Sequence, residues 1–205
     1  LTKKQAKQEA VAMLKKVGIP NPEARMKNYP HEMSGGMRQR VMIAMALSCS
    51  PSVLIADEPT TALDVTIQAQ ILELMLELRE NSNTAVVLIT HDMGVVAEMA
   101  DEIMVMYTGR VVEKGTAAEI FKNPLHPYTQ GLLASIPRVD QKVEKLHVTK
   151  GMVPNLFELP QGCKFADRCP YASGRCGREE PELLDKDGHL VRCFLCLKGE
   201  CEHGG

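Results

Sequence analysis

Two adjacent carboxylates in the first third of the chain, Asp57 and Glu58, could handle a metal-bound phosphate. They end a short apolar run that starts at Val53, and Pro59 prevents regular strand pairing beyond them. In open α/β sheets, ligands collect just outside the carboxyl ends of the strands. Carboxylates are also common on protein surfaces, so an isolated pair could simply open a polar loop. Their place at a strand end favours the phosphate site.

The apolar runs around these carboxylates predict the elements that position them. Residues 53–57 and residues 85–90 each read as a strand buried on both faces, and the segment between them reads as an amphipathic helix. A strand, a helix and a strand in this order make a right-handed crossover with parallel strands. His91 follows the second strand, so we expect it beside the carboxylates, although a helix-entry histidine is the alternative for this residue alone.

A second candidate site precedes the first strand. Ser34 is a good N-cap for the apolar helix that follows, and Gly35 and Gly36 allow backbone amides to approach a ligand closely. A helix N-terminus carries free N–H groups and a positive dipole end, so it can bind an anion. The alternative is an ordinary cap, with Arg38 and Arg40 as solvated charges on the polar face of the helix.

Composition limits the possible functions. The 205 residues include 24 Lys and Arg and 26 Asp and Glu, a formal net charge of −2, so the whole chain has no pull toward nucleic acid or anionic lipid. Hydrophobic residues make up 44%, enough for a core. The sequence shows no apolar run long enough to cross a membrane and no signal peptide. A membrane role is therefore expected to act through a partner.

Four motifs, in their order and spacing, resemble those of the ATP-binding subunit of an ABC transporter. Ser34-Gly35-Gly36 is similar to the family signature, Asp57-Glu58 to the Walker B pair, Ala62-Leu63-Asp64 to the D-loop, and His91 to the switch histidine. The run His126-Pro127-Tyr128-Thr129 is similar to the oligopeptide/dipeptide importer branch, which also includes nickel importers. The resemblance implies an α/β fold of the P-loop NTPase type, a parallel sheet with flanking helices.

The resemblance also implies a role for each matching residue. Glu58 would be the general base or water-positioning residue, and His91 would contact the γ-phosphate of ATP. Asp57 would hold the water shell of Mg²⁺. The signature residues 34–36 would bind the γ-phosphate of an ATP held by the opposite subunit, with Asp64 of the D-loop nearby.

The phosphate-cradling loop of such ATPases, Gly-x-x-x-x-Gly-Lys-Ser/Thr, is absent from these residues. The family places it upstream of the matching motifs, so we expect the chain to be the C-terminal portion of a longer ATPase and to be inactive alone. We expect residues 1–137 to be part of the ATPase domain. Residues 138–205 would be a small, irregular, cysteine-rich extension.

Six of the seven cysteines lie in this predicted extension. It resembles the extension of peptide-importer ATPases, in which four cysteines can hold a 4Fe–4S cluster. The implied ligands are Cys163, Cys169, Cys176 and Cys193. The spacing does not match the common ferredoxin pattern. A zinc site at Cys193-x-x-Cys196 with Cys201 and His203 is an alternative, as are a site without metal and disulfides, which a reducing cytosol disfavours.

The family membership would make the protein a peptide-importer ATPase. It would pair with a second ATPase subunit and dock on two permeases as a peripheral protein at the cytoplasmic face of the membrane. The solute would come from an extracytoplasmic binding protein, with no nucleic acid involved. An alternative is a metal- or iron–sulfur-binding regulatory module whose ATPase part is a scaffold. A chromosome-structure or repair ATPase is a third candidate, but it would need long coiled-coil heptads, which this sequence lacks.

Overall fold

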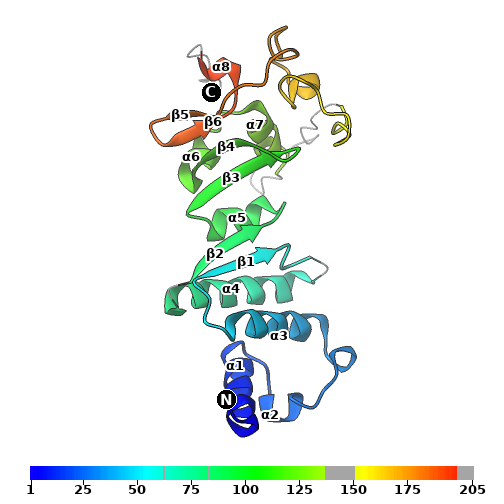
Figure 1. Cartoon of the computed structure of the whole chain (residues 1–205), viewed down its shortest axis with the longest axis vertical. Coiled ribbons are helices and arrows are strands. Elements are labelled where there is room, and N and C mark those ends of the chain that lie inside the picture. Colours follow the sequence, from blue (N-terminus) through cyan, green and yellow to red (C-terminus); the bar gives the residue numbers. More distant parts are fainter. Residues whose placement is uncertain (62, 83, 137–150, 198–205) are drawn as a thin grey trace. The chain divides into compact units, whose positions relative to one another are not determined.

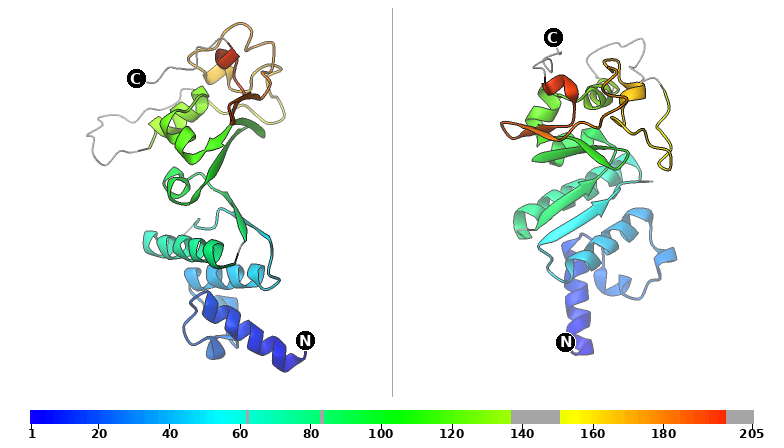
Figure 2. Two further views of the ribbon diagram at one scale, coloured as in Figure 1. Left: turned by 90° about the vertical axis from the view of Figure 1, so that its left-hand side faces the viewer. Right: turned by 45° about the horizontal axis from the view of Figure 1, so that its top comes forward.

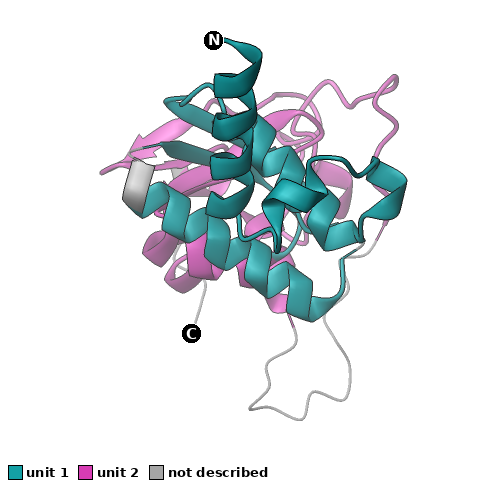
Figure 3. Cartoon of the chain, turned by 90° about the horizontal axis from the view of Figure 1, so that it is seen from below, with its two compact units in different colours: residues 1–92 teal, residues 93–205 magenta. Residues whose placement is uncertain are grey.

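The computed structural model describes residues 1–61, 63–82, 84–136 and 151–197. The chain divides into two compact units, Leu1–Asp92 (unit 1) and Met93–Gly205 (unit 2), which Figure 3 distinguishes by colour. The boundary predicted after residue 137 falls outside the described residues and stays a prediction.

Unit 1 begins with a helix that starts at a side-chain cap. The first helix starts at Thr2, whose hydroxyl accepts from the Gln5 amide at 3.3 Å while the Gln5 side chain accepts from the Thr2 amide at 2.8 Å. This capping box satisfies two amides that have no partner within the helix. Gly18, at φ +73°, follows the end of the helix. The helices of unit 1 are α1 (Lys3–Lys16), α2 (Pro22–Arg25), α3 (Gly35–Leu47) and α4 (Val65–Ser82), with a 3-10 turn at Pro30–Glu32.

The sheet of unit 1 confirms the predicted parallel crossover. Strand β1 (Val53–Asp57) pairs in parallel with β2 (Ala85–Ile89), and α4 connects them. The register places Asp57 opposite Ile89, so both strands end at the same edge. Figures 1 and 2 show α4 running alongside this two-stranded sheet. The residues that follow the strands therefore meet at one edge.

The prediction that these strands are buried on both faces is wrong for the described residues. Leu54 is buried, as are Ile71 and Met75 on α4. The opposite face of the sheet carries alternate apolar side chains that are 48–66% exposed, namely Val53, Ile55, Val87 and Ile89. One helix layer covers one face only, and an apolar run does not reveal how many layers cover a strand.

Unit 2 is built on a four-stranded sheet with the order β3-β4-β6-β5. The turn between the antiparallel strands β3 and β4 is Thr108-Gly109, with both residues in the left-handed region at φ +45° and +76°. The elements of unit 2 are α5 (Met93–Met99), β3 (Glu102–Tyr107), β4 (Arg110–Thr116), α6 (Ala117–Lys122), α7 (Pro127–Ala134), a 3-10 turn (Ala166–Arg168), β5 (Leu184–Lys186), β6 (His189–Val191) and α8 (Phe194–Leu197).

The cysteine-rich segment is less irregular than the sequence predicted. Strand β6 pairs antiparallel with β4, with Val191 opposite Glu113, and β5 pairs with β6. The turn between β5 and β6 is Asp187-Gly188, at φ +55° and +95°. Asp-Gly is a strong hairpin signal. The strands flanking it have three residues each, too few to show a pattern of alternation.

Phe165 joins the cysteine-rich segment to the core of unit 2. It is 2% exposed and packs with residues of β3, β4 and α6. Its ring centroid lies 5.3 Å from that of Tyr107 and 5.5 Å from that of Tyr128, both in edge-on geometry. Burying a phenylalanine contributes about 1.5–3 kcal/mol. The segment is therefore an integral part of unit 2.

Candidate active site

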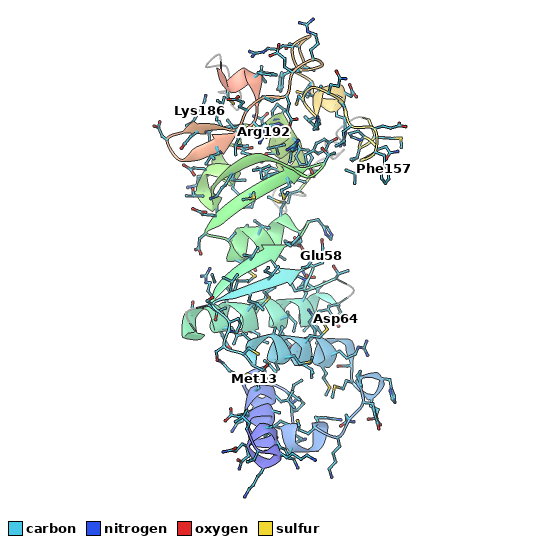
Figure 4. The ribbon with its side chains drawn as sticks, in the orientation of Figure 1. Met13, Glu58, Asp64, Phe157, Lys186 and Arg192 are labelled. Carbon is cyan, nitrogen blue, oxygen red and sulfur yellow. The ribbon has the colours of Figure 1, made fainter. Side chains whose placement is uncertain are left out.

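The chain leaves strand β1 through an unusual backbone conformation. Glu58 has φ +47°, in the left-handed region that non-glycine residues seldom occupy. Its amide donates to the Ile89 carbonyl at 2.9 Å. A residue held in this region costs on the order of 1–3 kcal/mol, and such residues cluster at functional sites. Figure 4 shows Glu58 and Asp64 at the same end of β1 and α4.

Glu58 and His91 form the pair that the topology predicted. The Nδ1 atom of His91 lies 2.8 Å from Oε1 of Glu58, and the Thr61 hydroxyl donates to Oε2 at 2.8 Å. Both side chains reach solvent, with His91 83% and Glu58 39% exposed. The hydrogen bond with His91 lowers the pKa of Glu58, and the same bond raises the pKa of His91. The pair thus favours an ionised carboxylate beside an imidazolium.

The other residues of this edge hold its loops in place. Asp64 caps α4, because its Oδ1 accepts from the Ile67 amide at 3.0 Å. The Gln68 side chain donates to Oδ2 of Asp92 at 3.2 Å, which ties α4 to the segment after β2. Asp57 is the last residue of β1, directly before Glu58. Thr61 was not predicted; its position three residues after Glu58 was the available signal.

The signature residues form a second group where α3 meets α4. Ser34 caps α3 by accepting from the Met37 amide at 3.3 Å, as predicted. A Cβ added to Gly36 would lie 2.6 Å from Cγ2 of Ile67, whereas one added to Gly35 would meet only Leu63, at 3.6 Å. The close packing of α3 on α4 therefore requires glycine at position 36. At position 35 the added Cβ would make only an ordinary van der Waals contact.

The arginines of α3 are not simply solvated charges. Arg38 donates to the Met33 carbonyl at 2.8 Å, which braces the loop before Ser34. Arg40 donates to the Val17 carbonyl at 2.7 Å and to the Gln70 side chain at 3.3 Å. Each arginine thus anchors the signature helix to a neighbouring segment.

The four cysteines implied as ligands lie together in unit 2. Every pair of thiols among them interacts electrostatically, and burial raises the pKa of three, that of Cys169 to about 11. Backbone amides donate to the sulfurs: those of Phe165 and Ala166 to Cys163, that of Tyr171 to Cys169, and those of Leu195 and Cys196 to Cys193. The Ser173 amide lies 3.4 Å from the sulfur of Cys176. Such amides stabilise a thiolate more than a thiol.

Two observations bear on the metal alternatives. Within the described residues, no three or more His, Cys, Asp or Glu side chains are arranged to hold a single metal ion. Cys196 is disulfide-bonded, which contradicts its role as a zinc ligand and agrees with the disulfide alternative for this residue. Cys201 and His203, the other predicted members of that zinc site, lie outside the described residues.

The helices of the described residues give no candidate for a membrane span, because none combines sufficient length with sufficient hydropathy.

Comparisons with known proteins agree with the sequence motifs. Residues 2–61 match the family "ABC transporter", and residues 112–176 match "Oligopeptide/dipeptide transporter, C-terminal region". The chain is 59% identical over 196 residues to the oligopeptide transport ATP-binding protein AppD of Bacillus subtilis, covering 95% of this chain and 60% of AppD. It is 55% identical over 192 residues to the dipeptide transport ATP-binding protein DppD of Escherichia coli, covering 93% of this chain and 59% of that protein.

A solved structure adds the fold. An inward-facing ABC transporter described as of metal-chelate type matches 62% of this chain and 47% of its own chain, with a TM-score of 0.53 and 27% identity. The chain spans about three fifths of the length of the curated relatives it matches. Over 95% of its length, the chain is homologous to the ATP-binding proteins of oligopeptide and dipeptide ABC transporters.

Proposed function

We propose that this chain is part of an ATP-binding and ATP-hydrolysing subunit that powers the import of oligopeptides or dipeptides through an ABC transporter. The hydrogen-bonded Glu58–His91 pair at the end of two parallel strands carries the proposal. The names of the relatives point to the same activity. None of these names supports a regulatory module with a scaffold ATPase part.

The proposed chemistry assigns one task to each side chain. Glu58, kept ionised by His91, would position and deprotonate the water that attacks the γ-phosphate. His91, whose pKa is raised, would offer a proton and positive charge to a phosphate oxygen. Asp57 would hold the water shell of Mg²⁺, which neutralises charge on the transferred phosphoryl group. The amides at residues 34–36 and Asp64 would contact ATP held by a second subunit.

A chimera tests this function. The chain replaces the aligned segment of AppD, and ATP hydrolysis by the assembled transporter is measured for Glu58→Gln and for Glu73→Gln, an exposed carboxylate on α4. Removing a general base lowers hydrolysis by roughly 10²–10⁴-fold. We expect that loss for Glu58→Gln and none for Glu73→Gln. Equal hydrolysis by the two variants would contradict the proposal.

The same proposal includes partners and location. The subunit would pair with a second ATP-binding subunit and dock on two permeases at the cytoplasmic face of the membrane, and an extracytoplasmic binding protein would deliver the solute. The homology to transporter ATP-binding proteins supports this assembly. Co-purification of the chimera with its permeases from detergent-solubilised membranes checks it, and recovery without permeases would argue against it.

We also propose that Cys163, Cys169, Cys176 and Cys193 hold a 4Fe–4S cluster. Their mutual proximity and the amides directed at their sulfurs fit a set of thiolate ligands. The bound cluster would supply a structural or redox-sensitive centre.

Metal analysis of the chain purified without oxygen tests the cluster. We expect iron and sulfide in equal amounts and brown absorbance near ~400 nm. Cys169→Ser should lose both, whereas Cys49→Ser, an exposed cysteine of unit 1, should retain both. Stoichiometric zinc, or colourless wild-type protein, would contradict the cluster.

A further inference from the structure

One carboxylate in unit 2 contacts basic side chains from three separate segments. Oε1 of Glu180 lies 3.3 Å from Nε of Arg110 and 3.9 Å from Nη1 of Arg192, and Oε2 lies 3.4 Å from Nζ of Lys164. Arg110 opens strand β4, Lys164 follows the first cysteine of the cluster, and Arg192 follows strand β6. Figure 4 labels Arg192 in unit 2.

Two of these basic residues adjoin cysteines of the cluster. Lys164 directly follows Cys163 in the sequence, and Arg192 directly precedes Cys193. Glu180 itself interacts electrostatically with Cys163. A carboxylate that attracts both Lys164 and Arg192 therefore draws the Cys163 loop and the Cys193 segment toward each other.

The Lys164 and Arg192 side chains also donate hydrogen bonds to backbone carbonyls, so the ionic contacts act on restrained segments. Arg192 donates from Nε to the Val111 carbonyl at 2.8 Å and from Nη1 to the Pro181 carbonyl at 3.0 Å. The Lys164 ammonium donates to the Pro160 carbonyl. The Glu180 side chain is 25% exposed, so solvent screens its attractions less than those of a fully exposed pair, but dissolved ions still reach it. Movement of the carboxylate is thus transmitted to both cysteine-bearing segments.

The remaining side of the cluster is held by backbone packing. The Cys163 amide donates to the Cys176 carbonyl at 2.7 Å. A Cβ on Gly162 would lie 2.2 Å from that same carbonyl oxygen, so this approach requires glycine. No comparable backbone bond between Cys163 and Cys193 is present in the part of the chain described.

We propose that Glu180 is the positioning residue of the four-cysteine site, an ionic pin that sets the spacing between Cys163 and Cys193. The inference rests on the proposed function, because spacing the two cysteines serves to bind the proposed cluster. The pin itself acts on the thiols whether or not metal is bound, so it can be tested separately.

Alkylation of the cysteines tests the pin. The reduced, metal-free 205-residue chain is treated with iodoacetamide, and mass spectrometry follows each cysteine in the wild type, in Glu180→Gln and in Glu179→Gln. Glu179 is the matched control, because it pairs with Arg175 and is exposed. We expect about tenfold faster labelling of Cys163 and Cys193 in Glu180→Gln, the change typical of losing a charge-assisted contact. Cys193 is the decisive readout, because loss of the Glu180 charge also lowers the pKa of Cys163 directly. Glu179→Gln should match the wild type.

Salt separates an ionic pin from a merely structural contact. At about 1 M salt the Debye length is near 3 Å, so labelling of Cys163 and Cys193 should accelerate in the wild type but not in Glu180→Gln. Wild-type rates in Glu180→Gln, or the same acceleration in Glu179→Gln, would overturn the inference. Wild-type labelling rates that do not change with salt concentration would also overturn it.

A second variant covers the case in which Glu180→Gln unfolds unit 2, seen as all four cysteines reacting at the denatured rate. Lys164→Met removes one basic partner of Glu180 and should accelerate the labelling of Cys163 but not that of Cys193. Equal acceleration of both cysteines, or of neither, contradicts the pin. A cluster missing from anaerobic wild-type protein, by contrast, refutes the proposed cluster and leaves the labelling comparison to decide the role of Glu180.

Discussion

The two signature glycines should respond differently to the same substitution. In Gly36→Ala the new Cβ would lie 2.6 Å from Cγ2 of Ile67, about 1 Å closer than an ordinary carbon contact. Ile67 is β-branched and on a helix, so its side chain has one strongly preferred rotamer and cannot simply turn away. Overpacking of this kind costs roughly 1–3 kcal/mol. The better helix propensity of alanine returns up to about 1 kcal/mol.

We therefore expect Gly36→Ala to destabilise the α3–α4 contact by about 1 kcal/mol and Gly35→Ala to leave it unchanged or slightly stabilised. Hydrogen exchange of α3 and α4 amides, read by mass spectrometry, measures the difference locally, which matters because a chain of two units need not unfold in one step. Adding Ile67→Ala to Gly36→Ala should remove the clash. The double variant should then exchange no faster than Ile67→Ala alone. In the AppD chimera, Gly35→Ala should lower ATP hydrolysis without loosening α3. Equal exchange in the two glycine variants would refute this reasoning.

The remaining predictions concern titration. NMR should find the pKa of His91 above its ordinary value of 6.5, and Glu58→Gln should return it toward that value because the carboxylate is the main cause. The contribution of His91 to the stability is complete below pH 6.5 and is lost as the pH rises through the raised pKa of His91. The contribution of Glu58 is lost as the pH falls through the lowered pKa of Glu58. Buried His126 has its pKa lowered by burial from 6.5 to about 4. As the pH falls, His126 is protonated in the unfolded chain at a higher pH than in the folded chain. Unit 2 should therefore lose up to roughly 3 kcal/mol of stability as the pH falls from 6.5 toward 4. Urea unfolding of unit 2 followed by tyrosine fluorescence checks this, and a stability independent of pH across that interval would contradict it.

Local patterns in the sequence were sufficient for the elements and for one edge of the site. Ser34 is a cap as predicted, and the apolar runs ending at Asp57 and before His91 are parallel strands. These features depend on neighbouring residues and on the fixed hand of a crossover, both of which can be read along the chain. The motif resemblance was confirmed by the relatives.

Long-range features depended on the folded chain. The sequence did not show that the outer face of β1 and β2 is exposed, because an apolar run is the same whether one layer or two cover it. It did not show that Gly36 is required by Ile67, which lies 31 positions away, or that Glu180 faces Lys164 and Arg192. The residue types for a phosphate site and a thiol site are thus evident in the sequence. Which residues hold those groups in position depends on contacts between distant segments, and only tertiary packing creates these contacts.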